Sequence, residues 1–157
     1  GKPIDILYVP PSKLEKRITR IIEKMKIKEK KIKDYQKKLL PKQKEIERLK
    51  EDFSYQNSFL DKKFKNLNSY VKDVNKRKNM SNSEYKKVKS YVDSRRKMIN
   101  KEIKKLKADQ NLIRGKVTNY NQDVRSLNFQ VREYDRLNKE IETLNRGFKK
   151  VKGMTFG

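Results

Sequence analysis

An apolar residue at every seventh position is the feature that most limits how this chain can fold. From Ile18 onward the positions spaced by seven are apolar nine times in succession: Ile18, Met25, Ile32, Leu39, Ile46, Phe53, Leu60, Leu67 and Val74. We call these the first heptad row. A second heptad row is apolar ten times in succession: Tyr85, Val92, Ile99, Leu106, Ile113, Tyr120, Leu127, Tyr134, Ile141 and Phe148. A sustained period of seven predicts helices that form a left-handed coiled coil.

The composition supports an elongated structure. Of the 157 residues, 33% are hydrophobic and 41% are charged, whereas ordinary soluble domains are roughly 45–50% apolar and about 25% charged. A compact globule of this length needs a larger core. The five Gly and four Pro are also too few for the many turns of a barrel or sandwich. The apolar residues must therefore lie along a thin line, which favours an all-α rod.

Two capping boxes mark where the helices begin. Ser12 is followed by Glu15, and Ser81 is followed by Glu84 at the same spacing. In this motif the serine side chain accepts a hydrogen bond from a free N–H of the first turn, and the glutamate reaches back to the cap. We expect one helix to start at each serine.

The fold class predicted is a long antiparallel two-helix coiled-coil hairpin over residues 12–150. Its helices cover about 12–77 and 82–150, each roughly 100 Å long at the α-helical rise, with a polar turn at about 78–82. A short connection favours antiparallel neighbours. Bundles in which two or more chains share the seams remain an alternative. Hairpins could also form homodimers through apolar residues outside the main seam, namely Ile22, Phe59, Phe64 and Val71.

Two details concern the seam between the helices. Pro41 predicts a bend in the first helix, because proline removes a backbone hydrogen bond. With the turn near Met80, Pro41 lies opposite residues 118–119 and near Gly115, so the two residues either share a bend or are unrelated. The positions three residues after the members of the first row and four residues after those of the second, which we call companion positions, include several polar residues. We expect these to fix the register between the helices at a cost in stability. They are Lys28, Lys42, Gln56, Gln110, Asn138 and Asn145.

Short β-like segments flank the hairpin. The entry segment, residues 1–11, contains a predicted strand at 4–9, and the exit segment, 151–157, is also β-like. In a hairpin the two ends meet. We expect them either to pair with each other or to join a larger parent domain, and the start of the chain suggests a trimmed or longer protein.

The composition excludes several chemistries. The sequence has no His and no Cys, so it lacks the usual ligands of zinc, haem and iron–sulfur centres and the residues of Ser–His or Cys–His catalysis. Carboxylates such as Glu45, Glu47, Glu51 and Asp52 are expected to lie on a solvated face. No apolar run is long enough to span a membrane. We predict a non-enzymatic chain without a cofactor, unless the natural chain adds a catalytic domain.

Basic residues supply the candidate binding site. Lys and Arg total 44 against 20 Asp and Glu, which gives a net charge of +24. Clusters lie at 24–38 and 95–107, and the turn region 76–89 adds the six residues predicted to contact a partner. These six are Lys76, Arg77, Lys78, Lys86, Lys87 and Lys89. Such a field attracts polyanions, so the partner could be an acidic protein surface, nucleic acid or an anionic membrane surface.

Part of the chain resembles a known coiled coil. The segments 70–75, 83–85, 119–121, 127–128, 137–138 and 144–145 are similar to the coiled-coil insertion of predicted bacterial matrixin-like zinc metalloproteases. The resemblance covers about residues 65–157 and implies a hairpin that follows a strand and precedes a catalytic His-Glu-x-x-His segment. Because this chain has no His and is more basic, the resemblance implies a non-catalytic arm, and no functional residue carries over.

The sequence therefore predicts a spacer or docking arm that mediates protein interaction through a basic tip. The alternative is binding of nucleic-acid phosphates by the basic helical shaft.

Overall fold

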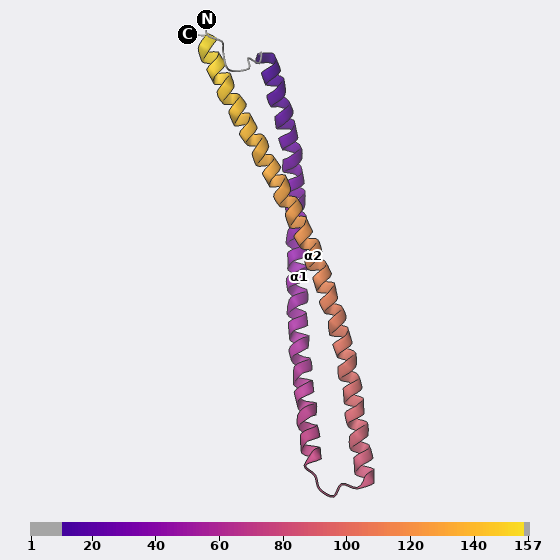
Figure 1. Cartoon of the computed structure of the whole chain (residues 1–157). Coiled ribbons are helices and arrows are strands. Elements are labelled where there is room, and N and C mark those ends of the chain that lie inside the picture. The colour runs from indigo at the N-terminus through magenta and orange to yellow at the C-terminus, as the bar shows by residue number, and fades with distance from the viewer. Residues whose placement is uncertain (1–10, 156–157) are drawn as a thin grey trace. The chain divides into compact units, whose positions relative to one another are not determined.

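The fold is an antiparallel helical hairpin. The computed structural model describes residues 11–155, and the side chains of 12–147. Helix α1 (Pro11–Asn75) and helix α2 (Asn82–Thr155) are joined by a loop at 76–81 (Figure 1). This confirms the predicted all-α hairpin, and residues 11–155 contain no strand. The strand predicted at 4–9 lies outside the described residues.

Both outer helix ends differ from the predicted boundaries. Helix α1 begins at Pro11, one residue before Ser12; proline is favoured at a first helical position, where its missing N–H is not needed. Helix α2 continues to Thr155, so the β-like exit segment was wrong for residues 151–155. No proline interrupts this stretch, and one Gly153 costs only about 1 kcal/mol in a helix that is already propagating.

The chain divides into two compact units. Unit 1 combines Gly1–Pro41 with Asn121–Gly157, and unit 2 is Lys42–Tyr120. Helix α1 includes Pro41, where the division falls. In unit 2, Lys42 Nζ donates a 2.8 Å hydrogen bond to Asn119 Oδ1, which agrees with the register predicted around residues 118–119. The bend at Pro41 and the left-handed winding of the helices remain predictions.

The two heptad rows form the core of unit 2. The buried cluster takes Leu60 and Leu67 from the first row and Val92, Ile99 and Leu106 from the second. Partly buried hydrophobic side chains pack around it: Phe53, Tyr70, Val71, Val88 and Ile103. Tyr85, the first member of the second row, is instead 59% exposed because it lies in the first turn of α2.

The seam of α2 in unit 1 is displaced from the predicted rows. The most buried residue of the described chain is Leu137, at 3% exposure, and it belongs to neither the second row nor its companion positions. Leu144, seven residues on, is half-buried, whereas Asn138 and Asn145 are exposed. Burial of Leu137 and Leu144 in place of Asn138 and Asn145 is favoured, because a buried leucine removes apolar surface from water, whereas an amide buried without a hydrogen-bond partner costs free energy.

Some predicted register-fixing residues therefore do not lie in the seam. Gln56, Gln110, Asn138 and Asn145 are exposed, whereas Lys28 and Lys42 are half-buried. The prediction was wrong for the first four because two helices bury only the narrow line along which they touch, so not every companion position faces the other helix.

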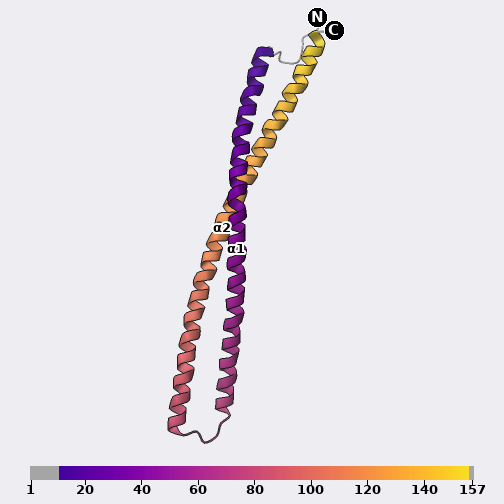
Figure 2. The same ribbon diagram turned by 180° about the vertical axis from the view of Figure 1, so that it is seen from behind.

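Local chemistry fixes the loop between the helices, seen from both sides in Figures 1 and 2. Arg77 N donates to Val74 O at 3.0 Å, and Asn79 has a φ of 71°, a left-handed conformation that asparagine tolerates. Ser81 Oγ then accepts a 3.1 Å hydrogen bond from Glu84 N. The predicted serine cap at the start of α2 is confirmed.

Truncation of a buried row residue should destabilise unit 2. Ile99 is 5% exposed and its chain neighbour Met98 is 51% exposed, so the pair provides a matched test. We expect Ile99→Ala to lower the free energy of unfolding by about 2–4 kcal/mol and Met98→Ala by less than about 0.5 kcal/mol, measured by urea denaturation followed by circular dichroism. Equal losses would contradict the assigned core.

Removal of the cap should weaken the start of α2. We expect Ser81→Ala to cost about 1 kcal/mol, because the Glu84 N–H loses its acceptor. Ser83→Ala, two residues away and inside the helix, should be neutral or slightly stabilising. Thermal unfolding of both variants checks this, and an unchanged midpoint for Ser81→Ala would show that the cap contributes nothing.

Candidate partner-binding site

The six predicted contact residues lie together at the loop end of unit 2. Every one of them is exposed. They come from the loop (Lys76, Arg77 and Lys78) and from the first turns of α2 (Lys86, Lys87 and Lys89). We call this set the basic tip. Within the described part of the chain, none of the six forms an ion pair. Their charges are therefore available to a partner.

Two members of the basic tip line a groove, and four do not. Arg77 and Lys89 border a groove of about 470 Å³, which we call the tip groove. Half-buried Val71, Val74 and Val88 supply its apolar lining, together with the exposed ring of Tyr85. Lys76, Lys78, Lys86 and Lys87 lie outside this lining. The groove thus combines cationic and apolar groups at the end of the hairpin.

The structure adds one cation that the sequence prediction omitted. Arg96 lines the tip groove together with Lys89, and Asp93 is the carboxylate that lines it. Arg96 had been grouped with the separate cluster at 95–107. Its spacing of seven from Lys89 was the available signal, because residues seven apart share a helix face.

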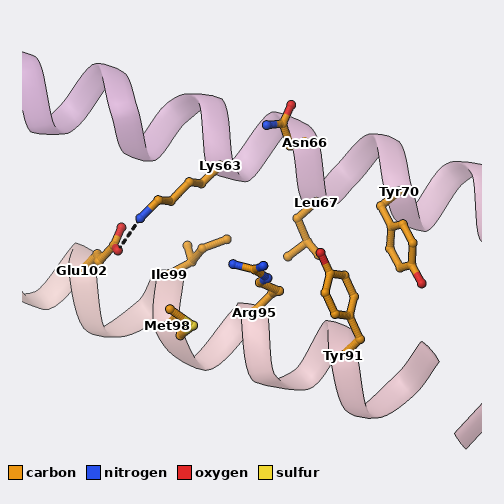
Figure 3. Close-up of a pocket in the computed structure, with 9 residues that line it drawn as sticks. All are labelled: Lys63, Asn66, Leu67, Tyr70, Tyr91, Arg95, Met98, Ile99 and Glu102. Carbon is orange, nitrogen blue, oxygen red and sulfur yellow. Dashed lines mark hydrogen bonds and ion pairs between the residues drawn. The ribbon is translucent and has the colours of Figure 1, made fainter. Parts of the chain in front are cut away.

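A second groove lies on another face of unit 2. Its lining, drawn in Figure 3, is Lys63, Asn66, Leu67, Tyr70, Tyr91, Arg95, Met98, Ile99 and Glu102. It continues past Lys63 and Glu102 into a stretch lined by Tyr55, Phe59, Lys105 and others. We call the whole depression the side groove. Sequence reasoning did not identify it.

Contacts between the helices fix the floor of the side groove. Lys63 Nζ lies 2.7 Å from Glu102 Oε1, as the dashed line in Figure 3 marks. The rings of Tyr70 and Tyr91 meet edge to face with centroids 4.9 Å apart. The Arg95 guanidinium lies 5.3 Å from the centroid of the Tyr91 ring, within the range of a cation–π interaction.

A third polar contact joins the helices near the other end of unit 2. Lys116 Nζ donates a 2.8 Å hydrogen bond to Glu45 Oε1. This hydrogen bond, and the positive charge of Lys116, lower the pKa of the Glu45 carboxyl from its ordinary value. Glu45, a carboxylate predicted to lie on a solvated face, is exposed and is also the partner of a lysine on the opposite helix.

The part of the chain that the structure describes holds no cluster of three or more Asp or Glu side chains arranged for a metal ion. Neither described helix has a stretch long and apolar enough to cross a membrane.

Comparison with known proteins adds no further assignment. No protein-family model, curated protein or solved structure matches the chain. The resemblance to the coiled-coil insertion of matrixin-like zinc metalloproteases stays a prediction from the residues that carry it.

Removal of the Lys116 ammonium should raise the Glu45 pKa toward its ordinary value. Because the pKa is lowered in the folded chain, the pair stabilises the fold above the ordinary carboxyl pKa, and this contribution is lost as the pH falls through the folded value. We expect Lys116→Met to raise the Glu45 pKa and Lys44→Met to leave it lowered, as measured by carboxyl ¹³C NMR titration; the charge of Arg48, which also lowers the pKa, remains in both variants. A Glu45 titration unchanged by Lys116→Met would refute the contact.

Proposed function

We propose that the chain is a non-enzymatic spacer or docking arm that binds an acidic protein surface through its basic tip. The observation that carries the proposal is the set of six exposed cations around the loop, none of them ion-paired with a described residue. Arg77 and Lys89 of this set border a groove that also exposes Tyr85. A partner with carboxylates around an apolar or aromatic side chain would match it.

The charge at the tip is uneven enough to orient a partner. Few carboxylates stand near the tip cations, namely Asp73, Glu84 and Asp93. A single exposed ion pair contributes only about 0–1 kcal/mol, so affinity has to come from several pairs together with burial of the groove. Charge complementarity of this kind mainly raises the association rate and selects the partner.

The hairpin supplies the spacing. At 1.5 Å per residue, the part of α1 from Lys42 to Asn75 is about 50 Å long, and the tip lies at its loop end. A coiled-coil winding of the two heptad rows would stiffen this arm. The function is then geometric, because the arm holds a charged contact away from the other end of unit 2, at Lys42 and Tyr120.

Binding of nucleic-acid phosphates by the basic shaft is the second candidate. The net charge of +24 favours it, and the cluster at 24–38 in unit 1 would contribute as much as the tip. Binding of this kind depends on how many Lys and Arg side chains contact phosphates and not on where they lie in the chain. Its affinity falls steeply as the salt concentration rises. The two candidates therefore differ in whether the position of the charge matters.

Neutralising the tip should abolish acidic-partner binding. The tip variant changes all six tip residues to Gln. A matched shaft variant changes six exposed lysines of unit 1 to Gln: Lys24, Lys26, Lys30, Lys31, Lys37 and Lys38. The probes are a fluorescent Glu-rich peptide containing Phe and Leu and a 20-base-pair DNA, titrated by anisotropy at 50–300 mM salt. We expect the tip variant to bind the peptide at least about tenfold more weakly and the shaft variant within about threefold.

The same titrations contain the contrary result. One contrary result is that both variants lose the same amount of affinity for the peptide. The other is that the unmodified chain still binds DNA above 150 mM salt but no longer binds the peptide. Either result would show that the basic shaft is a general polyanion surface, and the docking proposal would fail.

A further inference from the structure

The side groove exposes apolar side chains that the hairpin itself leaves uncovered. Phe59, Tyr91 and Met98 are 52%, 44% and 51% exposed, respectively, and all three line the groove. Tyr91 and Met98 are seven residues apart on α2 and line one stretch of the groove. Phe59 of α1 lines the other stretch, beyond the Lys63–Glu102 ion pair. The groove thus exposes apolar side chains on both sides of this ion pair.

Burial in the hairpin is incomplete without a further element. No described side chain is less than 2% exposed, because two helices can cover only the line along which they touch. A helix of a globular protein ordinarily buries a stripe about 100° wide or more. A third helix laid in the side groove would complete such a stripe on both α1 and α2, as in a helical bundle.

We infer that the side groove binds an amphipathic helix of a partner protein, with apolar residues on one face and carboxylates along its edges. From Tyr55 to Tyr70 the groove follows about 22 Å of α1 at the helical rise. This length matches about four turns of a bound helix. Helix-in-groove recognition of this kind uses anchors spaced by three, four and seven residues.

The positive charges around the groove favour a partner that carries negative charge. Arg95 and Lys105 line the groove and have no carboxylate partner in the described part of the chain. Lys63 is already paired with Glu102. A bound helix with Glu or Asp at its edges would pair with Arg95 and Lys105, and its apolar anchors would cover Tyr91 and Met98.

The same charges argue against a second copy of this chain as the occupant. A copy docked through its own side groove would bring its own Arg95 and Lys105 against the first pair. Each chain also carries a net charge of +24, and like charges in contact are unfavourable. An acidic helix relieves both problems.

The inference is tested with two designed peptides. One is an 18-residue helix with Leu at positions spaced by three and four and Glu at the flanking positions. The other has the same composition in scrambled order, so the two peptides share one net charge. Anisotropy with the full chain at 150 mM salt should show at least tenfold tighter binding of the amphipathic peptide.

Paired variants locate the binding. Phe59→Ser with Met98→Ser should weaken binding of the amphipathic peptide at least tenfold. The control, Phe64→Ser with Ile27→Ser, removes side chains of similar exposure, 49% and 57%, outside the groove lining, and should change binding less than threefold. Circular dichroism verifies that both variants keep their helix content.

Three results would overturn the inference. They are equal affinity for the two peptides, equal loss in the two double variants, or a dimer in sedimentation that only the Phe59→Ser, Met98→Ser variant dissociates. The last result would assign the groove to a second copy. The tip variant should still bind the amphipathic peptide within threefold, so this test and the test of tip docking fail independently.

Discussion

The facing of two apolar rows is the interaction on which the rest of the structure depends. With only 33% hydrophobic residues, the chain excludes water along a narrow line, which in unit 2 runs where Leu67 on α1 meets Val92 and Ile99 on α2. This packing sets the register, and the register decides which polar groups meet across the helices. Lys63 reaches Glu102 and Lys116 reaches Glu45 because the buried rows leave these pairs at the flanks of the seam. The positions of the basic tip and of both grooves follow from this register.

Much of the fold was predictable because its signals are local or strictly periodic. A period of seven states which residues turn inward, and a Ser–Glu spacing marks a helix start without knowledge of the partner helix. The shift of the seam to Leu137 was not predictable in the same way. Leu137 and Asn138 lie three and four residues after Tyr134, and the period of seven alone does not say which of the two faces the other helix. The helical course of residues 151–155 was missed because β-propensity depends strongly on context.

The candidate site was predictable in part for a related reason. Charge near a turn is visible in the sequence, and the six tip residues do lie together at the loop. Arg96 was not predicted to belong to the tip, because neighbours in sequence place it in the cluster at 95–107. In the structure it shares a helix face with Lys89 and lines the tip groove. The side groove could not be predicted, since that requires knowing that Tyr70 on α1 and Met98 on α2 line the same depression. That juxtaposition depends on the register between helices.

The loop at 76–81 also determines the order in which parts of the two helices pair during folding. Lys63 and Glu102 are 39 positions apart along the chain, whereas Arg17 and Glu140 are 123 apart. Loop closure becomes entropically more costly as the enclosed segment lengthens. The first contact between the helices with the lowest entropic cost is therefore beside the loop. Pairing then extends away from the loop, because each paired turn shortens the segment that the next contact must close. We expect unit 2 to form before unit 1, so that the basic tip is in place before Arg17 meets Glu140.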